Sequence, residues 1–143
     1  MKIKDVIQHK SSQVVVTIGP EATVRELVAL LAEHNVGALV VSQDGERVDG
    51  IVSERDVVRR LHEDAGVLDS SVSSIMTAEV RTCAGDDGLT ELMQTMTEHR
   101  IRHVPVVADG RLTGIISIGD VVKNRIGELE FERDQLDHYV HQT

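Results

Sequence analysis

One internal repeat constrains this chain more than any other feature of its 143 residues. The stretch "GIVSERDVV" at residues 50–58 returns as "GIISIGDVV" at residues 114–122. With Arg47 treated as one extra residue, nine of the 22 aligned positions between residues 36–58 and 101–122 are identical. Residues that recur 65 positions later are Val15, Thr17, Glu26, Leu27, Glu33 and His34. A repeat of this length predicts two copies of one supersecondary unit that pack against each other.

Each copy has the same predicted order of elements. A short β-type run, "VVVTI" at residues 14–18 and "VRTC" at residues 80–83, precedes an amphipathic helix, which Thr23 caps in the first copy. Two aliphatic strands separated by an Asp-Gly turn come next, and a second helix begins at Ser53 or Ser117. The order β-α-β-β-α, found twice, predicts an α+β fold whose copies are related by a pseudo-two-fold axis, because one such unit cannot cover its own sheet.

The repeat also suggests where the segments of the chain begin and end. We expect the first copy over residues 1–61, a polar linker over 62–72, the second copy over 73–126 and a C-terminal helical extension over 127–143. The last helix is predicted to continue from Asp120 toward His141. Its apolar residues form one stripe, which consists of Val122, Ile126, Leu129, Leu136 and Val140, and Phe131 and Tyr139 lie nearby. Such a stripe favours packing against a neighbour, so we expect a homodimer.

Composition narrows the classes of partner. The formal net charge is −9, and the chain has one Phe, one Tyr and no Trp, so nucleic acid is not an expected partner. A single cysteine, Cys83, allows no internal disulfide. We find no signal segment, no apolar run long enough to span a membrane and no zinc-type Cys/His spacing. We therefore expect a cytoplasmic protein with no membrane association and no bound metal.

The repeated Ser-x-x-Asp element has two interpretations. In the first, Ser53 and Ser117 cap their helices, and Asp56 and Asp120 favour the positive end of the helix dipole. In the second, the helix N-terminus binds an anion, and the nearby carboxylate accepts hydrogen bonds from the vicinal hydroxyls of a ribose. Phosphate beside ribose would mean a nucleotide, and the residues alone leave both interpretations open.

The twofold pattern, with "HNVGALVVSQDG", "GIVSERDVV", "HRIRHVPVVADG" and "GIISIGDVV", resembles a tandem pair of CBS domains. The resemblance covers about residues 3–126. Within the family, the chain is similar to small stand-alone CBS-pair proteins. It implies one adenosyl site for each Ser-x-x-Asp element, with Ser53 and Asp56 at the first and Ser117 and Asp120 at the second. It also implies that the base is held between strands, near Gly37-Ala38 and near Arg102-His103.

The two copies differ in their positive charges. Arg55 stands where the second copy has Gly119, and Arg100, Arg102 and His103 precede the central strand of the second copy only. Phosphate recognition requires cations or N–H donors, so we expect two unequal sites. For Arg100 and Arg102, a solvated strand edge or helix end remains an equal alternative.

The leading hypothesis is therefore a non-enzymatic sensor. It would bind AMP, ADP, ATP or a related adenosyl compound such as NAD, and would signal to a partner protein that the sequence does not identify. The alternative is a dimeric adaptor with structural or vestigial nucleotide sites. An enzyme acting on nucleotides is disfavoured, because Cys83 aligns with Ile18 as a core position and no phosphate-binding or nucleophile motif is present. No catalytic cofactor is expected. His99 and His103 should not share a helix face, and Met93 and Met96 should be core residues.

Overall fold

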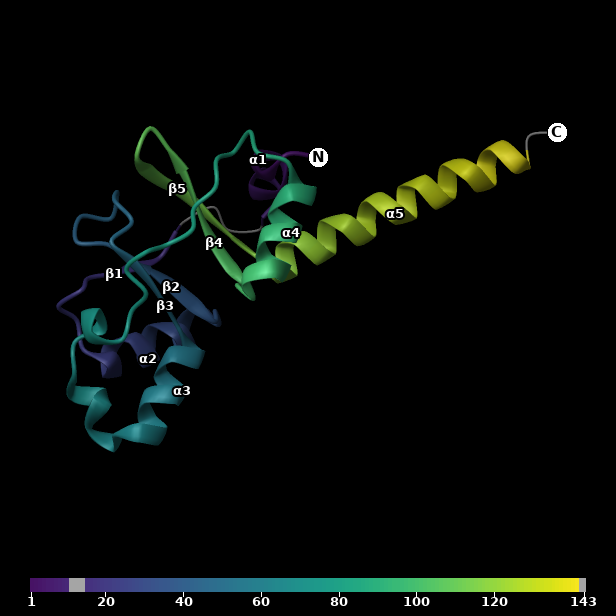
Figure 1. The fold of residues 1–143 in the computed structure, drawn as a ribbon. Coiled ribbons are helices and arrows are strands. Elements are labelled where there is room, and N and C mark those ends of the chain that lie inside the picture. Colours follow the sequence, from purple (N-terminus) through teal and green to yellow (C-terminus); the bar gives the residue numbers. More distant parts are fainter. Residues whose placement is uncertain (11–14, 142–143) are drawn as a thin grey trace.

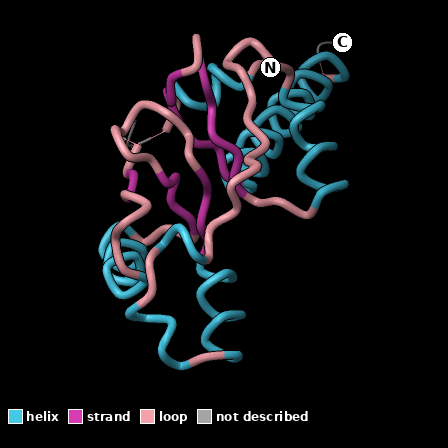
Figure 2. The backbone as a smooth tube through the Cα atoms, turned by 60° about the vertical axis from the view of Figure 1, so that its left-hand side comes forward, coloured by secondary structure: helices cyan, strands magenta, loops and turns pink. Residues whose placement is uncertain are grey.

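The strands of the two repeat copies form separate sheets that lie beside each other, with helices at both ends of the molecule (Figures 1 and 2). The computed structural model describes residues 1–10 and 15–141, so Val14 of the expected first strand and the last two residues lie outside the described part. This arrangement confirms the predicted α+β class with two copies of one unit.

The first copy builds a three-stranded sheet of order β1-β2-β3. Its strands are β1 (Thr17–Ile18), β2 (Ala38–Val41) and β3 (Gly50–Ser53), and its helices are α2 (Val24–His34) and α3 (Glu54–Glu63). β1 is parallel to β2, and β2 is antiparallel to β3. Thr23 caps α2 as predicted, since its Oγ1 accepts a hydrogen bond from the Glu26 amide at 3.1 Å. The start of α2 is therefore determined by a local capping residue, as the sequence indicated.

The second copy repeats this plan with a shorter first strand. It contains α4 (Leu89–His99), β4 (His103–Ala108), β5 (Arg111–Ser117) and α5 (Ile118–Val140). The expected strand over residues 80–83 is reduced to one bridge, in which the Cys83 amide donates to Pro105 O at 3.0 Å and Val107 N donates to Cys83 O at 2.8 Å. The chain turns directly afterwards, because the Ala84 amide is bonded to the Asp87 carboxylate at 2.8 Å. The β-α-β-β-α order is thus complete in the first copy only.

The Asp-Gly turns differ between the copies. Asp109 and Gly110 have φ values of 52° and 77°, as a two-residue hairpin turn of type I′ requires, and they join β4 directly to β5. In the first copy, a longer loop at residues 42–49 contains Gly45, with φ 79°. The extra Arg47 lies in that loop, where the Asp44 carboxylate accepts the Arg47 amide at 2.9 Å. The insertion is therefore absorbed outside the sheet.

The described residues form two hydrophobic cores, and each core contains a segment from elsewhere in the chain. The N-terminal helix α1 (Ile3–Gln8) packs against β5 and α5, and Ile3 and Val6 are fully buried in the second core. The segment with the 3-10 helices η1 (Ala65–Asp69) and η2 (Val72–Ser74) buries Val67 and Val72 in the first core. The stretch expected as a linker thus contributes to a core, while the segment boundaries themselves stay a prediction.

Each repeated motif begins with a glycine, Gly50 or Gly114, over which a segment from elsewhere in the chain packs closely. A Cβ on Gly50 would lie 2.6 Å from Met76 Sδ and 2.9 Å from Thr77 O, so only glycine fits there. A Cβ on Gly114 would lie 3.3 Å from Ile7 Cδ1. Ile7 and Met76 therefore occupy matching positions, each laid across the first residue of the motif in the sheet that it covers.

The C-terminal helix extends far from the rest of the molecule (Figure 1). α5 begins at Ile118 and confirms the predicted continuous helix. Val121 is its buried residue, whereas the predicted stripe, consisting of Val122, Ile126, Leu129, Leu136 and Val140, is 47–65% exposed. No helix within the described residues has the length and apolarity needed to span a membrane. The cytoplasmic location stays a prediction.

Candidate functional site

Both Ser-x-x-Asp elements form capping boxes at helix N-termini. Ser53 Oγ accepts the Asp56 amide at 3.3 Å, and Asp56 Oδ2 accepts the Ser53 amide at 2.8 Å and its hydroxyl at 3.1 Å. Ser117 and Asp120 repeat this geometry, with 3.2 Å and 2.9 Å for the two reciprocal bonds. The capping interpretation is therefore confirmed. It does not exclude a ligand, since the bonds of the Asp56 carboxylate within the described residues all go to Oδ2 and leave Oδ1 available.

A cavity of about 290 Å³ lies where the two copies meet. Its lining residues are Gly37, Ala38, Ile51, Ser53, Glu54, Arg55, Asp56, Arg59, Thr77, Arg100, Ile101, Arg102 and His103. Small-molecule sites have volumes of roughly 300–1,000 Å³, so this interface cavity is at the lower end for a small organic ligand. The copies approach each other closely here: a Cβ on Gly37 of the first copy would lie 3.5 Å from His103 Cε1 of the second.

Backbone hydrogen bonds position the strands and helix starts around the interface cavity. Ala38 pairs with Ser53 across the first sheet, and the Glu54 amide donates to Gly37 O at 2.9 Å. At the matching place in the second copy, His103 pairs with Ser117, and the Ile118 amide donates to Arg102 O at 2.8 Å. Each central strand is thus tied to the start of the following helix, which holds the Ser-x-x-Asp element beside it.

The interface cavity is rich in positive charge. Four arginines line it, against two carboxylates, although the whole chain carries a net charge of −9. In the described part of the chain, none of Arg55, Arg59, Arg100 and Arg102 forms an ion pair with a carboxylate, unlike Arg25, Arg111, Arg125 and Arg133 elsewhere. Arg100 also adopts a left-handed conformation, with φ 53°, as the C-cap of α4. Guanidinium groups gathered without carboxylate partners are suited to an anionic ligand.

His103 lies half-buried at the junction of the two copies. Burial lowers the pKa of His103 below its usual value of 6.5, and the positive charges of Lys10 and Arg102 act in the same direction. The carboxylates of Asp120 and Glu54 oppose this shift without cancelling it. The imidazole is therefore held as a neutral group that can accept a hydrogen bond or a proton.

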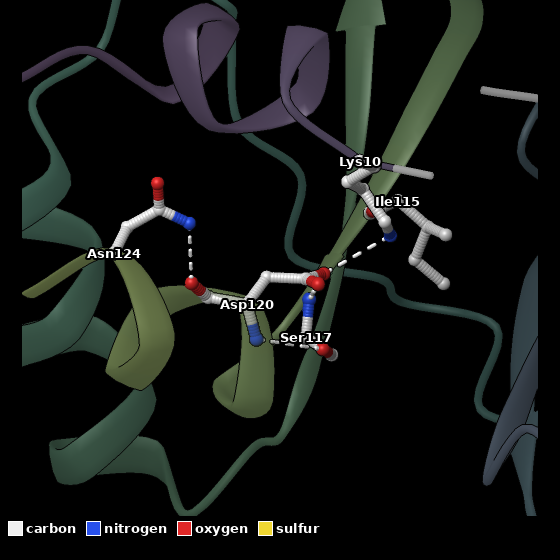
Figure 3. A network of polar contacts seen from close by, with 5 residues as sticks. All are labelled: Lys10, Ile115, Ser117, Asp120 and Asn124. Atoms are coloured by element: carbon white, nitrogen blue, oxygen red, sulfur yellow. Dashed lines mark hydrogen bonds and ion pairs between the residues drawn. The ribbon is translucent and has the colours of Figure 1, made fainter. Parts of the chain in front are cut away.

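The structure brings eight of the ten predicted site residues together. These are Gly37, Ala38, Ser53, Arg55, Asp56, Arg100, Arg102 and His103, which all line the interface cavity. Ser117 and Asp120 do not line it. The Asp120 carboxylate instead receives Lys10 Nζ at 3.0 Å (Figure 3). Burial raises the pKa of Asp120, but the Ser117 amide and Lys10 outweigh this effect and leave the pKa below its usual value.

Sequence reasoning missed some of the lining residues. Arg59 lies one helical turn after Arg55 on α3, so the i, i+4 spacing could have identified it. Thr77 had no local signal, because it reaches the cavity only through pairing of its backbone with Ile51. Lys10 likewise reaches Asp120 only because α1 packs on the second copy.

Other residues considered as candidates have structural positions. Cys83 is packed against the second core, and burial raises the pKa of its thiol to about 12, so it is no activated nucleophile. Met96 is buried, and Met93 packs against the same core, as predicted. α4 ends at His99 and β4 begins at His103, so these two histidines do not share a helix face. Within the described residues, no group of three or more His, Cys, Asp or Glu side chains gathers as metal ligands do.

Comparisons with known proteins agree on one family. The model of the CBS domain matches residues 3–63 and again residues 72–127. The solved structure of a CBS-domain containing protein from Agrobacterium tumefaciens is 44% identical, with a TM-score of 0.82, and the match covers 87% of this chain and 99% of that one. A mitochondrial CBS domain-containing protein from Arabidopsis thaliana is 38% identical over 123 residues, which are 82% of this chain and 60% of that protein's length.

A third match was solved with ligands. The CBS domain pair of the protein MJ0100, in complex with 5-methylthioadenosine and S-adenosyl-L-methionine, is 25% identical with a TM-score of 0.78. The match covers 90% of this chain and 98% of that one.

Proposed function

The chain belongs to the CBS-domain family, and we propose that it is a non-enzymatic regulatory module that binds an adenine nucleotide in the interface cavity and signals to a partner protein. The proposed ligands are AMP, ADP and ATP, with NAD as a related compound. Adenosyl ligands in the MJ0100 domain pair support this chemical class.

The proposal depends on one observation. In the described part of the chain, four arginines without carboxylate partners line the same cavity as Asp56, whose carboxylate has one oxygen free of hydrogen bonds. Asp56 Oδ1 can accept hydrogen bonds from ribose hydroxyls, while Arg55, Arg59, Arg100 and Arg102 can donate to phosphate oxygens. A neutral or cationic adenosyl compound would leave these arginines without partners. We therefore propose anionic nucleotides in preference to 5-methylthioadenosine or S-adenosyl-L-methionine.

The neighbouring apolar side chains complete this assignment. Ile51 and Ile101 line the same cavity, and Ala38 begins β2 beside it. With no Phe, Tyr or Trp in the lining, the base would pack between aliphatic side chains, while Ser53 would lie near the phosphate. Binding can alter the signalling state only if the ligand prefers one arrangement of the two copies.

Thermal unfolding with and without ligand tests the proposal. At about 100 times its dissociation constant, a ligand adds roughly 2.7 kcal/mol of stability at one site. We expect AMP or ATP to raise the melting temperature of the parent protein, and 5-methylthioadenosine to raise it less at equal concentration. Asp56→Asn and Arg59→Gln should each reduce the shift with AMP or ATP. The control is Arg60→Gln, which removes a neighbouring exposed arginine of α3 that does not line the cavity. Equal shifts for all variants would contradict the proposal.

The C-terminal helix favours a second candidate function, that of a dimeric adaptor. The stripe on the 23-residue helix α5 is exposed, whereas most of the stability of helices in proteins comes from packing of their apolar face. We propose that a second copy of the chain covers the stripe. Equilibrium dialysis with labelled AMP separates the two candidates, because an adaptor with vestigial sites would dimerise without retaining nucleotide.

A further inference from the structure

The second copy holds a built-in cation at the carboxylate that corresponds to Asp56. Lys10 Nζ lies 3.0 Å from Asp120 Oδ2 and 2.9 Å from Ile115 O, so the ammonium group bridges a side chain and a backbone carbonyl (Figure 3). The Lys10 and Asp120 side chains are only 25% and 22% exposed. An ion pair so shielded from water is screened less by salt than a pair on the open surface.

The described residues of the first copy contain no such cation. There the carbonyl that matches Ile115 O belongs to Ile51, and it accepts the Thr77 amide at 2.9 Å. Because Ile7 and Met76 occupy matching positions over the two glycines, the residue that corresponds to Lys10 is Glu79. No ion pair within the described residues involves Asp56. The two copies thus differ in the sign of the charge that follows the exchanged segment.

We propose that Lys10 restricts the chain to one adenosyl ligand, bound at Asp56, by occupying the Asp120 carboxylate of the second copy. This inference rests on the proposed nucleotide site of the first copy. The Lys10 ammonium and the Ser117 amide both bind Oδ2 of Asp120, and the ammonium neutralises the charge of this carboxylate. A ribose that approached Asp120 would meet a weaker acceptor and would compete with Lys10 for it. At Asp56, a ribose meets a carboxylate whose charge no ion pair within the described residues neutralises.

The N-terminal segment holds Lys10 in this place. Ile3 and Val6 of α1 are fully buried in the second core, and the chain reaches Lys10 directly after the helix, with the Lys10 amide donating to Ile7 O at 3.2 Å. The ammonium is therefore held near Asp120 by a folded segment. Each folded chain therefore carries one ammonium group that competes with a ribose for its Asp120.

Isothermal titration with AMP and with ATP, which reports moles bound per chain, tests the inference. We expect one mole for the parent protein and two for Lys10→Met, with the second site tightened by at least about tenfold, which corresponds to about 1.4 kcal/mol. Lys10→Arg, which keeps the cation, should retain one mole. The matched control is Lys4→Met, because Lys4 is a lysine of the same segment whose exposed ion pair, 3.0 Å from Asp86, lies outside the interface cavity.

Combination with Asp56→Asn separates this inference from the proposed function. Asp56→Asn alone should bind no nucleotide, and Lys10→Met with Asp56→Asn should bind one mole. Two moles for the parent, one mole for both the parent and Lys10→Met, or lost binding in Lys10→Met with an unchanged circular dichroism spectrum would each overturn the role of Lys10. If the parent binds none while Lys10→Met binds one, the role of Lys10 stands and the proposed site at Asp56 falls. If no variant binds, both fall.

Discussion

Arg100 combines a conformational cost with a place in the interface cavity. Its left-handed conformation, with φ 53°, costs a residue with a side chain roughly 1–2 kcal/mol, and glycine avoids this cost. We therefore expect Arg100→Gly to raise the free energy of unfolding by up to about 1 kcal/mol. It should also weaken AMP binding by about tenfold or more, because charge-assisted hydrogen bonds are worth roughly 1.5–3 kcal/mol. Chemical denaturation and titration calorimetry measure the two effects.

Asn35 is the matched control for Arg100. It caps α2 in the same left-handed conformation, with φ 52°, but it does not line the interface cavity. Asn35→Gly should change stability by less, since asparagine tolerates this conformation better, and it should leave binding unchanged. Unaltered AMP affinity in Arg100→Gly would remove Arg100 from the binding site and leave it as a helix cap.

His103 should make stability depend on pH. Because burial lowers its pKa in the folded state below 6.5, the unfolded chain takes up the proton first as the pH falls. The contribution of the neutral imidazole is therefore complete above pH 6.5 and is lost as the pH falls from there through the folded-state pKa. We expect denaturation curves between about pH 5 and pH 8 to show a shallower loss of stability at low pH for His103→Gln than for the parent.

The control for this effect is His34→Gln, which removes an exposed histidine at the end of α2. Comparison of the two variants separates the effect of the half-buried position of His103 from the loss of an imidazole as such. A His103→Gln variant with the same pH dependence as the parent would mean that the folded chain admits the imidazolium at no cost. In that case the attraction of the imidazolium to the neighbouring carboxylates would offset the cost of its burial. These carboxylates belong to Asp120 and Glu54.

At the scale of elements, α1 should stabilise the second copy more than the first. Ile3 is fully buried in the second core, and truncation of a buried isoleucine to alanine costs about 2–5 kcal/mol. We expect Ile3→Ala to lower hydrogen-exchange protection in β4 and β5 more than in β2 and β3. Val28→Ala, at a position of α2 that is 40% exposed, is the control and should cost little. Equal loss in both sheets would show that the two cores unfold as one unit.

For the whole molecule, we expect α5 to strengthen self-association. A chain that ends after Ile126 lacks Leu129, Leu136 and Val140 of the exposed stripe, so the dissociation constant of the dimer should rise by at least about tenfold. Sedimentation at several concentrations measures it. Asp134→Ala alters an exposed residue outside the stripe and should leave association unchanged. Unchanged dissociation after truncation would assign the interface to the two copies alone.

Local signals decided a large part of the fold and of the site. The Ser-x-x-Asp caps, the end of α4 before His103 and the Asp109-Gly110 turn each depend on residues within one or two turns of chain. The repeat then predicted that the copies pair, because neither covers its own sheet. Eight of the ten predicted residues consequently line one cavity.

Tertiary structure alone decided which segment covers which core. The segments that contain Ile3 and Val72 have similar apolar spacing, so neither pattern states which sheet it will meet, and the choice follows from packing across the whole chain. That choice sets Lys10 against Asp120 and brings Thr77 into the cavity. The repeat thus predicted two matching halves with different arginines, and long-range burial added a cation at Asp120 that no local pattern indicates.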